Sequence, residues 1–267
     1  MNLDLQGKTA LVTGGSRGIG RAIAHELAVC GCTVVIFARD EATLKAAAED
    51  ISRRSGGTVV GIVADVRDID SVDRGVKTAA RILGGRIDIL VNNAAAPGGL
   101  AGGPVADIND EDVLTDLDTK VVGYLRCARA VAPYMVENGW GRIINIGGNS
   151  ARMPGTSLSA GMRNAALVTM TKYLADELGP AGITANVVHP GATWTERSAG
   201  MYAAQAEREG VSVEDIKSRV GDRNSIKRIV DASEVACVVA FLSSPRSSAI
   251  TGETISAGGG VGDAVYY

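Results

Sequence analysis

The sequence of 267 residues has few aromatic side chains, few cysteines and no long hydrophobic run. Phe, Trp and Tyr make up 4% of the chain, so aliphatic side chains and alanine must fill its interior. The spacing of its four cysteines matches neither a disulfide framework nor a zinc site, which predicts a reduced chain without a metal centre. A membrane-spanning helix needs about 20 apolar residues in a row, and no run approaches that length. The four cysteines are Cys30, Cys32, Cys127 and Cys237.

The charge of the chain is close to balance. It has 27 Lys and Arg against 30 Asp and Glu, for a net charge of −3. Nothing in this composition favours a nucleic acid or an anionic membrane as a partner. The first residues also lack the basic and then apolar pattern of an export signal. We therefore expect a cytoplasmic protein whose partner is a small-molecule substrate.

What the sequence does have is a regular alternation of short apolar runs with amphipathic stretches. The strand-like runs are 10–12, 34–37, 58–63, 87–92, 142–147, 184–189 and 253–256. The helix-like stretches are 18–30, 41–55, 69–83, about 110–138, about 160–178 and 233–243. This alternation predicts an α/β fold, a single Rossmann domain over 1–267 with a doubly wound, seven-stranded parallel sheet and helices on both faces. Ligands of such sheets bind beyond the carboxyl ends of the strands.

A glycine-rich turn joins the first predicted strand to the first predicted helix. Glycines at this place let the backbone approach a pyrophosphate, and the free N–H groups and dipole of the helix attract the anion. Its position between a strand and a helix is the context in which such a turn binds a dinucleotide. The predicted contacts are Thr13, Gly14, Ser16, Arg17, Gly18, Ile19 and Gly20.

An arginine, Arg39, follows the second predicted strand. A carboxylate at this place would accept hydrogen bonds from the ribose 2′-OH of NAD(H), whereas an arginine suits the 2′-phosphate of NADP(H). Arg17 in the glycine turn carries the same charge. The sequence therefore predicts NADP(H) as the cofactor in preference to NAD(H).

The spacing Thr13-Gly14-xxx-Gly18-x-Gly20 resembles the TGxxxGxG turn of the short-chain dehydrogenase/reductase family, which binds NAD(H) or NADP(H) there. The resemblance covers nearly the whole chain, and it includes the NNAA run at 92–95 and the Pro190-Gly191 pair with Thr195. It implies that Asp65 contacts the adenine region and that Thr195 holds the nicotinamide carboxamide. The cofactor contacts it adds are Asp65, Val66, Asn92, Ala94, Asn164, Pro190, Gly191 and Thr195.

The positions that carry the family's catalytic residues differ in this sequence. The family uses an Asn, a Ser, a Tyr and a Lys, the last two four residues apart on one helix face. The run TKYLADEL at 171–178 fixes the register, which places Ala160 at the Tyr position and Asn164 at the Lys position. Gly148 stands at the Ser position and Lys120 at the Asn position. The resemblance thus implies a divergent member in which all four residue types are replaced.

Lys120 is the one candidate catalytic residue that remains. General acid–base catalysis typically contributes about 10²–10⁴-fold in rate, and glycine, alanine and asparagine cannot supply it. A buried lysine can act as an acid, a base, an imine former or an anion site. Ser159 precedes the Tyr position, but one helical residue is about 100° of rotation, so its side chain is expected to point elsewhere.

Three functions therefore stay open from the sequence. The first is an oxidoreductase that acts on a small carbonyl or alcohol by an altered route. The second is a non-redox enzyme on the same scaffold, a lyase, hydrolase or isomerase that uses Lys120. The third is a nucleotide-sensing or partner-binding protein without activity.

The residues after Pro190-Gly191, about 194–228, occupy the place of the family's variable substrate lid. The substrate pocket is predicted to include Gly148, Asn149, Trp194, Met201 and Tyr202. His25 and His189 have no catalytic neighbours in the sequence and are predicted to be structural. The family also implies a homodimer or homotetramer built through two long central helices.

Overall fold

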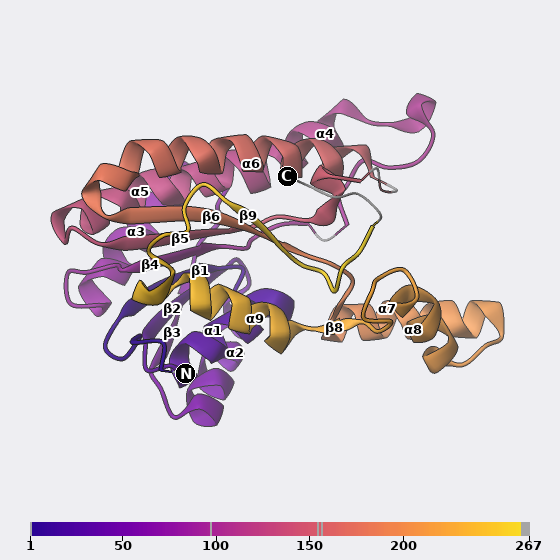
Figure 1. Ribbon diagram of the computed structural model, residues 1–267, viewed down its shortest axis with the longest axis horizontal. Helices are drawn as coiled ribbons and strands as arrows, with labels where there is room; N and C mark the ends of the chain where they lie inside the picture. Colours follow the sequence, from indigo (N-terminus) through magenta and orange to yellow (C-terminus); the bar gives the residue numbers. More distant parts are fainter. Residues whose placement is uncertain (1, 97, 154, 156, 263–267) are drawn as a thin grey trace.

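A seven-stranded parallel sheet lies between two layers of helices (Figure 1). The computed structural model describes residues 2–262 except 97, 154 and 156. The sheet order is β3-β2-β1-β4-β5-β6-β9, so the chain winds outward in both directions from its first strand. This confirms the doubly wound Rossmann fold. The strands are β1 (Thr9–Thr13), β2 (Thr33–Ala38), β3 (Val59–Val63), β4 (Ile89–Asn92), β5 (Gly141–Ile146), β6 (Ile183–Pro190) and β9 (Thr254–Ala257).

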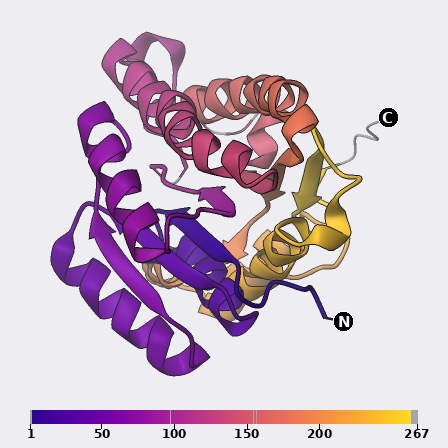
Figure 2. The ribbon, with the colours of Figure 1, turned by 90° about the vertical axis from the view of Figure 1, so that its left-hand side faces the viewer.

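The helices divide into the two layers because alternate side chains of each strand face opposite ways. In β1, Ala10 and Val12 belong to the core under α1, α2 and α9, whereas Leu11 belongs to the core under α3, α5 and α6. Figure 2 shows the sheet between these layers from the side. The helices are α1 (Gly18–Val29), α2 (Glu41–Ser55), α3 (Ile69–Ile82), α4 (Asp110–Leu117), α5 (Gly123–Glu137), α6 (Leu158–Leu178), α7 (Glu196–Glu209), α8 (Val213–Gly221) and α9 (Ala232–Leu242).

Local chemistry explains where several helices begin and end. The Asp40 carboxylate accepts a hydrogen bond from the Thr43 N–H at the start of α2, which satisfies one of the helix's free donors. The same helix ends at Gly56, whose φ of 71° suits glycine.

Within the described residues, no helix combines the length and apolarity that a membrane span requires.

Two features differ from the sequence prediction. The single helix expected at about 110–138 is two helices, α4 and α5, joined by a π-helical turn at Asp118–Val122. A second, two-stranded sheet pairs β7 (Thr193–Trp194) with β8 (Val230–Asp231). Helices α7 and α8 lie between these two strands in the sequence and project from the main body (Figure 1). Both features lie next to the carboxyl ends of the central strands, where ligands of this fold bind.

Candidate functional site

Glycines let the turn before α1 pack closely on the start of this helix. Gly14 and Gly18 have φ angles of 65° and 55°, which residues with a Cβ rarely adopt. A Cβ added at Gly20 would lie 2.3 Å from the Gly14 carbonyl oxygen, so the helix can approach the turn this closely only with glycine. Arg17 precedes α1 and makes no side-chain capping bond. The first N–H groups of the helix therefore have no partner from the N-cap side chain and favour an anion.

The turn is held on the end of β4 by hydrogen bonds. The Thr13 hydroxyl accepts from the backbone N–H groups of Asn93 and Ala94 at 2.9 and 3.1 Å. The Asn93 amide donates in return to the carbonyl oxygens of Thr13 and Gly14. Asn92 is buried and donates to the Asn145 side chain at 2.9 Å, which ties β4 to β5. These hydrogen bonds thus join Thr13, Gly14 and Ala94, and Asn92 is buried at the end of β4.

A second group of predicted residues lies at the ends of β2 and β3. Burial raises the pKa of Asp65, but the hydrogen bonds and charge of Arg67, with a further contribution from Arg39, outweigh it and leave this pKa below its usual value. The Arg67 guanidinium pairs with Asp65 at 2.9 Å. The pKa of Asp40 is also lowered. Hydrogen bonds from Thr43 cause most of this shift, and the positive charge of Arg17 adds a smaller part. The positive charges of Arg39 and Arg17 therefore act on carboxylates at the ends of β3 and β2.

Lys120 lies in the interior, at the end of β5. Its ammonium donates to the Gly147 carbonyl oxygen at 2.9 Å, and the residue is 4% exposed. Burial, followed by the positive charge of Arg163, lowers its pKa well below the usual value, and Asp116 opposes this shift. The residue belongs to the π-helical turn between α4 and α5. Such turns are frequent at functional sites because they redirect a side chain.

Asn164 fills the space beside Gly148. A Cβ added at Gly148 would lie 2.6 Å from the Asn164 side-chain nitrogen. That nitrogen donates to the Ser150 hydroxyl at 2.8 Å, and Ser150 donates to the Ala160 carbonyl oxygen at 3.1 Å. The Asn164 side-chain oxygen is buried without a hydrogen-bond partner among the described residues. A serine at position 148 would therefore require Asn164 to leave Ser150.

The loop after β4 packs directly on Ala160. A Cβ added at Gly99 would lie 3.0 Å from the Ala160 methyl group. The Ser157 hydroxyl donates to the Ala101 carbonyl oxygen at 2.7 Å, which fixes the same loop to the start of α6. Ala160 is 8% exposed as a result. A large side chain at position 160 would collide with this loop.

A buried ion pair holds this loop in place, and the sequence did not reveal it. Arg163 pairs with Asp116 at 2.6 Å, and the two side chains are 4% and 0% exposed. Arg163 also donates to the Ala96 carbonyl oxygen at 2.7 Å, and the Leu100 N–H donates to Asp116 at 2.7 Å. The Ser159 hydroxyl donates to Asp116 as well, so this serine points away from the side chain of Ala160. Asp116 precedes Lys120 by four residues, and residues at this spacing lie on one face of a helix. This spacing is the sequence feature that could have predicted Asp116 near Lys120.

His189 is buried at the end of β6. Its Nδ1 accepts from the Gly148 N–H at 2.8 Å, and its Nε2 has no hydrogen-bond partner among the described residues. A Cβ added at Gly147 would lie 2.2 Å from the ring, so glycine is required there. Burial, with the charges of Arg152 and Lys120, lowers the pKa of His189 from 6.5 to about 4.

This pKa predicts a pH dependence of stability. Between pH 6.5 and about 4 the unfolded chain binds a proton that the neutral, folded His189 does not bind. The contribution to the free energy of unfolding is therefore complete above pH 6.5 and is lost as the pH falls towards 4, by at most about 1.4 kcal/mol per pH unit. Urea unfolding of the wild type and of His189→Gln across this range measures the difference. Parallel stability curves for the two proteins would contradict the assignment.

The comparisons with known proteins agree with this geometry. The family profile described as enoyl-(acyl carrier protein) reductase matches residues 14–262. The short-chain reductase protein NovJ of Streptomyces niveus is 36% identical over 255 residues, covering 96% of this chain and 94% of NovJ. The 3-oxoacyl-[acyl-carrier-protein] reductase FabG of Aquifex aeolicus is 34% identical over 267 residues, covering 98% and 100%. The chain belongs to the short-chain dehydrogenase/reductase family.

A solved structure of the same family superimposes closely on this one. The L-sorbose reductase of Gluconobacter frateurii, complexed with NADPH and L-sorbose, has a TM-score of 0.93 at 30% sequence identity, covering 99% of this chain and 100% of that one. A single-residue variant of the actinorhodin polyketide ketoreductase, with NADPH, has a TM-score of 0.87 at 33% identity, covering 96% and 98%. The shared fold therefore extends over the whole described chain, including α7 and α8.

The remaining residues predicted from this family lie around the carboxyl end of β6. Asn149 donates weakly to the Pro190 carbonyl oxygen at 3.4 Å and accepts from Ser256 at 3.2 Å. Thr195 caps α7 by accepting from the Ser198 N–H at 3.2 Å. Its methyl group would lie 3.7 Å from a Cβ added at Gly18, so it stands beside the glycine turn.

Two aromatic residues of the segment 194–228 pair with each other. The ring centroids of Trp194 and Tyr202 are 6.1 Å apart, and the Lys217 ammonium lies 4.8 Å from the centre of the Trp194 ring. Met201 is 57% exposed. The structure therefore brings Trp194 and Tyr202 together, while it places Met201 at the surface.

Proposed function

We propose that the protein is an oxidoreductase that binds NADP(H) and acts on a small carbonyl or alcohol compound. The observation that carries this proposal is the glycine turn before α1, where a helix N-terminus favours an anion, together with the positive charges of Arg17 and Arg39, which act on carboxylates at the ends of β2 and β3. The names of several relatives support it. BacG of Bacillus subtilis, 33% identical over 255 residues, is an NADPH-dependent reductase.

The residues present fit a nicotinamide dinucleotide. Gly14 and Gly20 allow the turn to pack closely on the start of α1, the place where such folds bind the pyrophosphate, and Thr195 stands beside Gly18. Arg39 supplies a positive charge beyond β2. In this fold the 2′-phosphate binds there, and this phosphate is present in NADP(H) and absent from NAD(H). When bound, the nicotinamide supplies or accepts a hydride. The chain binds and orients the dinucleotide and supplies the proton.

We propose that Lys120 is the group that donates or accepts the proton of the reaction. Ala160 and Gly148 carry no ionisable group, and Asn164 is occupied with Ser150. Lys120 is buried between α4 and α5, where desolvation makes its ammonium a stronger acid than a free lysine. Its Nζ can hold a proton against the Gly147 carbonyl oxygen and release it towards the site. This is the altered route that we expect if Lys120, Gly148, Ala160 and Asn164 stand at the family's catalytic positions.

A second candidate function uses the same amine without redox chemistry. A lysine with a depressed pKa is the group that forms imines with carbonyl compounds, as lyases of such compounds require. Reductive trapping with borohydride distinguishes the two, because only an imine leaves a covalent adduct on Lys120. A nucleotide-binding protein without activity is the third possibility, and it would bind NADPH without turnover of any carbonyl compound.

A titration with NADPH, NADH, NADP⁺ and NAD⁺ tests the proposal. We expect NADPH to bind more tightly than NADH in the wild type. The Arg39→Ala variant should bind NADPH about 10- to 100-fold more weakly, because a hydrogen bond to a charged group contributes about 1.5–3 kcal/mol. Its affinity for NADH should change little, since NADH lacks the 2′-phosphate.

Arg81→Ala is the matched control, because Arg81 is an exposed arginine near the end of α3, outside the proposed site. It removes the same charge and should leave both affinities as they are. Equal weakening of NADPH by the two variants would show a general charge effect and would contradict the assignment of Arg39. Failure of all four nucleotides to bind would overturn the oxidoreductase proposal itself.

The assembly and location of the protein stay proposals as well. Large apolar side chains are exposed on the helices of one layer, including Leu114 on α4, Leu125 on α5 and Met162 on α6. They support a homodimer or homotetramer through these helices, which sedimentation velocity tests. A cytoplasmic location remains a prediction from the sequence.

A further inference from the structure

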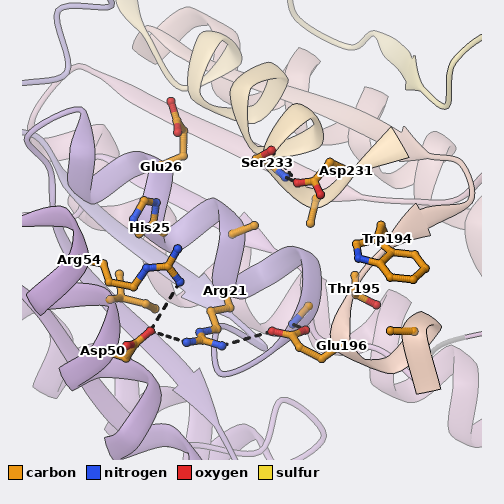
Figure 3. Close-up of a pocket in the computed structure, with 15 residues that line it drawn as sticks. Arg21, His25, Glu26, Asp50, Arg54, Trp194, Thr195, Glu196, Asp231 and Ser233 are labelled. Carbon is orange, nitrogen blue, oxygen red and sulfur yellow. Dashed lines mark hydrogen bonds and ion pairs between the residues drawn. The ribbon is translucent and has the colours of Figure 1, made fainter. Parts of the chain in front are cut away.

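A carboxylate from the lid region lies on the start of α1. The Gly18 N–H donates to Glu196 Oε2 at 3.2 Å, and Arg21 Nη1 donates to Oε1 at 3.2 Å (Figure 3). Glu196 is the first residue of α7, so this contact joins α7 to the glycine turn across 178 residues of sequence. Arg21 also pairs with Asp50 on α2. Figure 3 shows this row of Asp50, Arg21 and Glu196.

The contact occupies a position that favours a negative charge. Free N–H groups and the helix dipole stabilise an anion at the start of a helix. The pyrophosphate of a dinucleotide uses the same feature of the glycine turn. The carboxylate therefore competes with a phosphate both for the Gly18 N–H and through repulsion between like charges.

We propose that Glu196 is a latch between α7 and the glycine turn, which a dinucleotide must displace to bind. This proposal rests on the proposed binding of NADP(H). The latch takes the place of the anion in the free protein and holds the start of the lid region against α1. Phosphate binding releases the carboxylate, so cofactor binding and the position of α7 are coupled.

The surroundings of Glu196 suit a latch that opens. Its side chain is 62% exposed, so it can return to water without leaving a buried charge behind. A hollow of about 620 Å³ lies beside it, bordered by Trp194, Ala199 and Asp231. Arg21 keeps its ion pair with Asp50 when Glu196 leaves, so α1 stays in place.

The test compares Glu196→Gln with the wild type by calorimetric titration with NADPH. We expect the variant to bind about 3- to 10-fold more tightly, since it removes the competing charge. Glu207→Gln makes the same charge change at an exposed position of the same helix and should bind NADPH as the wild type does. Without nucleotide, amide hydrogen exchange in the first turn of α7 should be faster in Glu196→Gln than in either other protein.

Each result separates the latch from the cofactor proposal. If the wild type binds NADPH and Glu196→Gln binds it equally or more weakly, the latch is overturned and the cofactor proposal stands. Equal tightening by Glu207→Gln also overturns the latch, because the effect is then one of net charge. If none of the three proteins binds NADPH, the cofactor proposal fails and the latch fails with it.

Discussion

Replacing Asp116 by alanine is expected to lower the free energy of unfolding by about 3–5 kcal/mol. The carboxylate is fully buried and accepts hydrogen bonds from Arg163, Ser159 and the Leu100 N–H. Its removal leaves the Arg163 guanidinium charged, 4% exposed and without its counter-ion. A buried charge that loses its partner costs far more than a surface ion pair contributes.

Urea unfolding measures this effect, with Asp176→Ala as the matched control. Asp176 pairs with Lys172 on α6, but both side chains are more than half exposed, so its loss should cost less than about 1 kcal/mol. The double variant Asp116→Ala with Arg163→Met should recover most of the loss, because no unpaired charge then remains buried. Similar losses in Asp116→Ala and Asp176→Ala would contradict the importance of the buried pair.

The Asp116–Arg163 pair also bears on the architecture of the site. Through Ala96 and Leu100 it fixes the loop after β4 against α6, where Gly99 contacts Ala160. The space above Ala160 is therefore filled by backbone. We infer that a tyrosine introduced at position 160 would not fit unless this loop moved.

The sequence predicted the sheet and its helices because these depend on local patterns. Buried parallel strands are short apolar runs, and the helices between them bury one face, so the order of elements follows from periodicity. The glycine turn was equally predictable, since φ angles of 65° and 55° at Gly14 and Gly18 demand glycine. The family register also assigned positions such as Lys120 and Asn164 to the site, and these assignments stay predictions.

The parts that the sequence did not predict are contacts between distant elements. Asp116 and Arg163 are 47 residues apart and lie on different helices. Hydrophobic periodicity predicts the helices but not which polar side chains of two helices come into contact. Glu196 and Gly18 are 178 residues apart, and their contact was unpredictable for the same reason. The π-helical turn at Asp118–Val122 has no glycine or proline within it, so nothing local marks the break in the predicted helix.

Replacing Lys120 by methionine is expected to lower kcat/KM for carbonyl reduction by about 10²–10⁴-fold, the usual contribution of a general acid. Methionine has a similar length and no charge, so it removes the buried ammonium without opening a cavity. The NADPH affinity should change less than about threefold, because the ammonium donates to the Gly147 carbonyl oxygen rather than to the glycine turn. Lys172→Met, which replaces an exposed lysine on α6, is the control and should retain full activity.

The pH profile decides whether Lys120 acts through its proton. Burial depresses the pKa of this lysine, so its ammonium is lost at a lower pH than that of a free lysine. If the ammonium is the acid, the rate of reduction falls as the pH rises through that pKa, and the residual rate of Lys120→Met lacks this decline. Unchanged turnover in Lys120→Met would remove the residue from the mechanism. Gly148, Ala160 and Asn164 do not ionise, so the proton would then have to come from solvent or from another side chain.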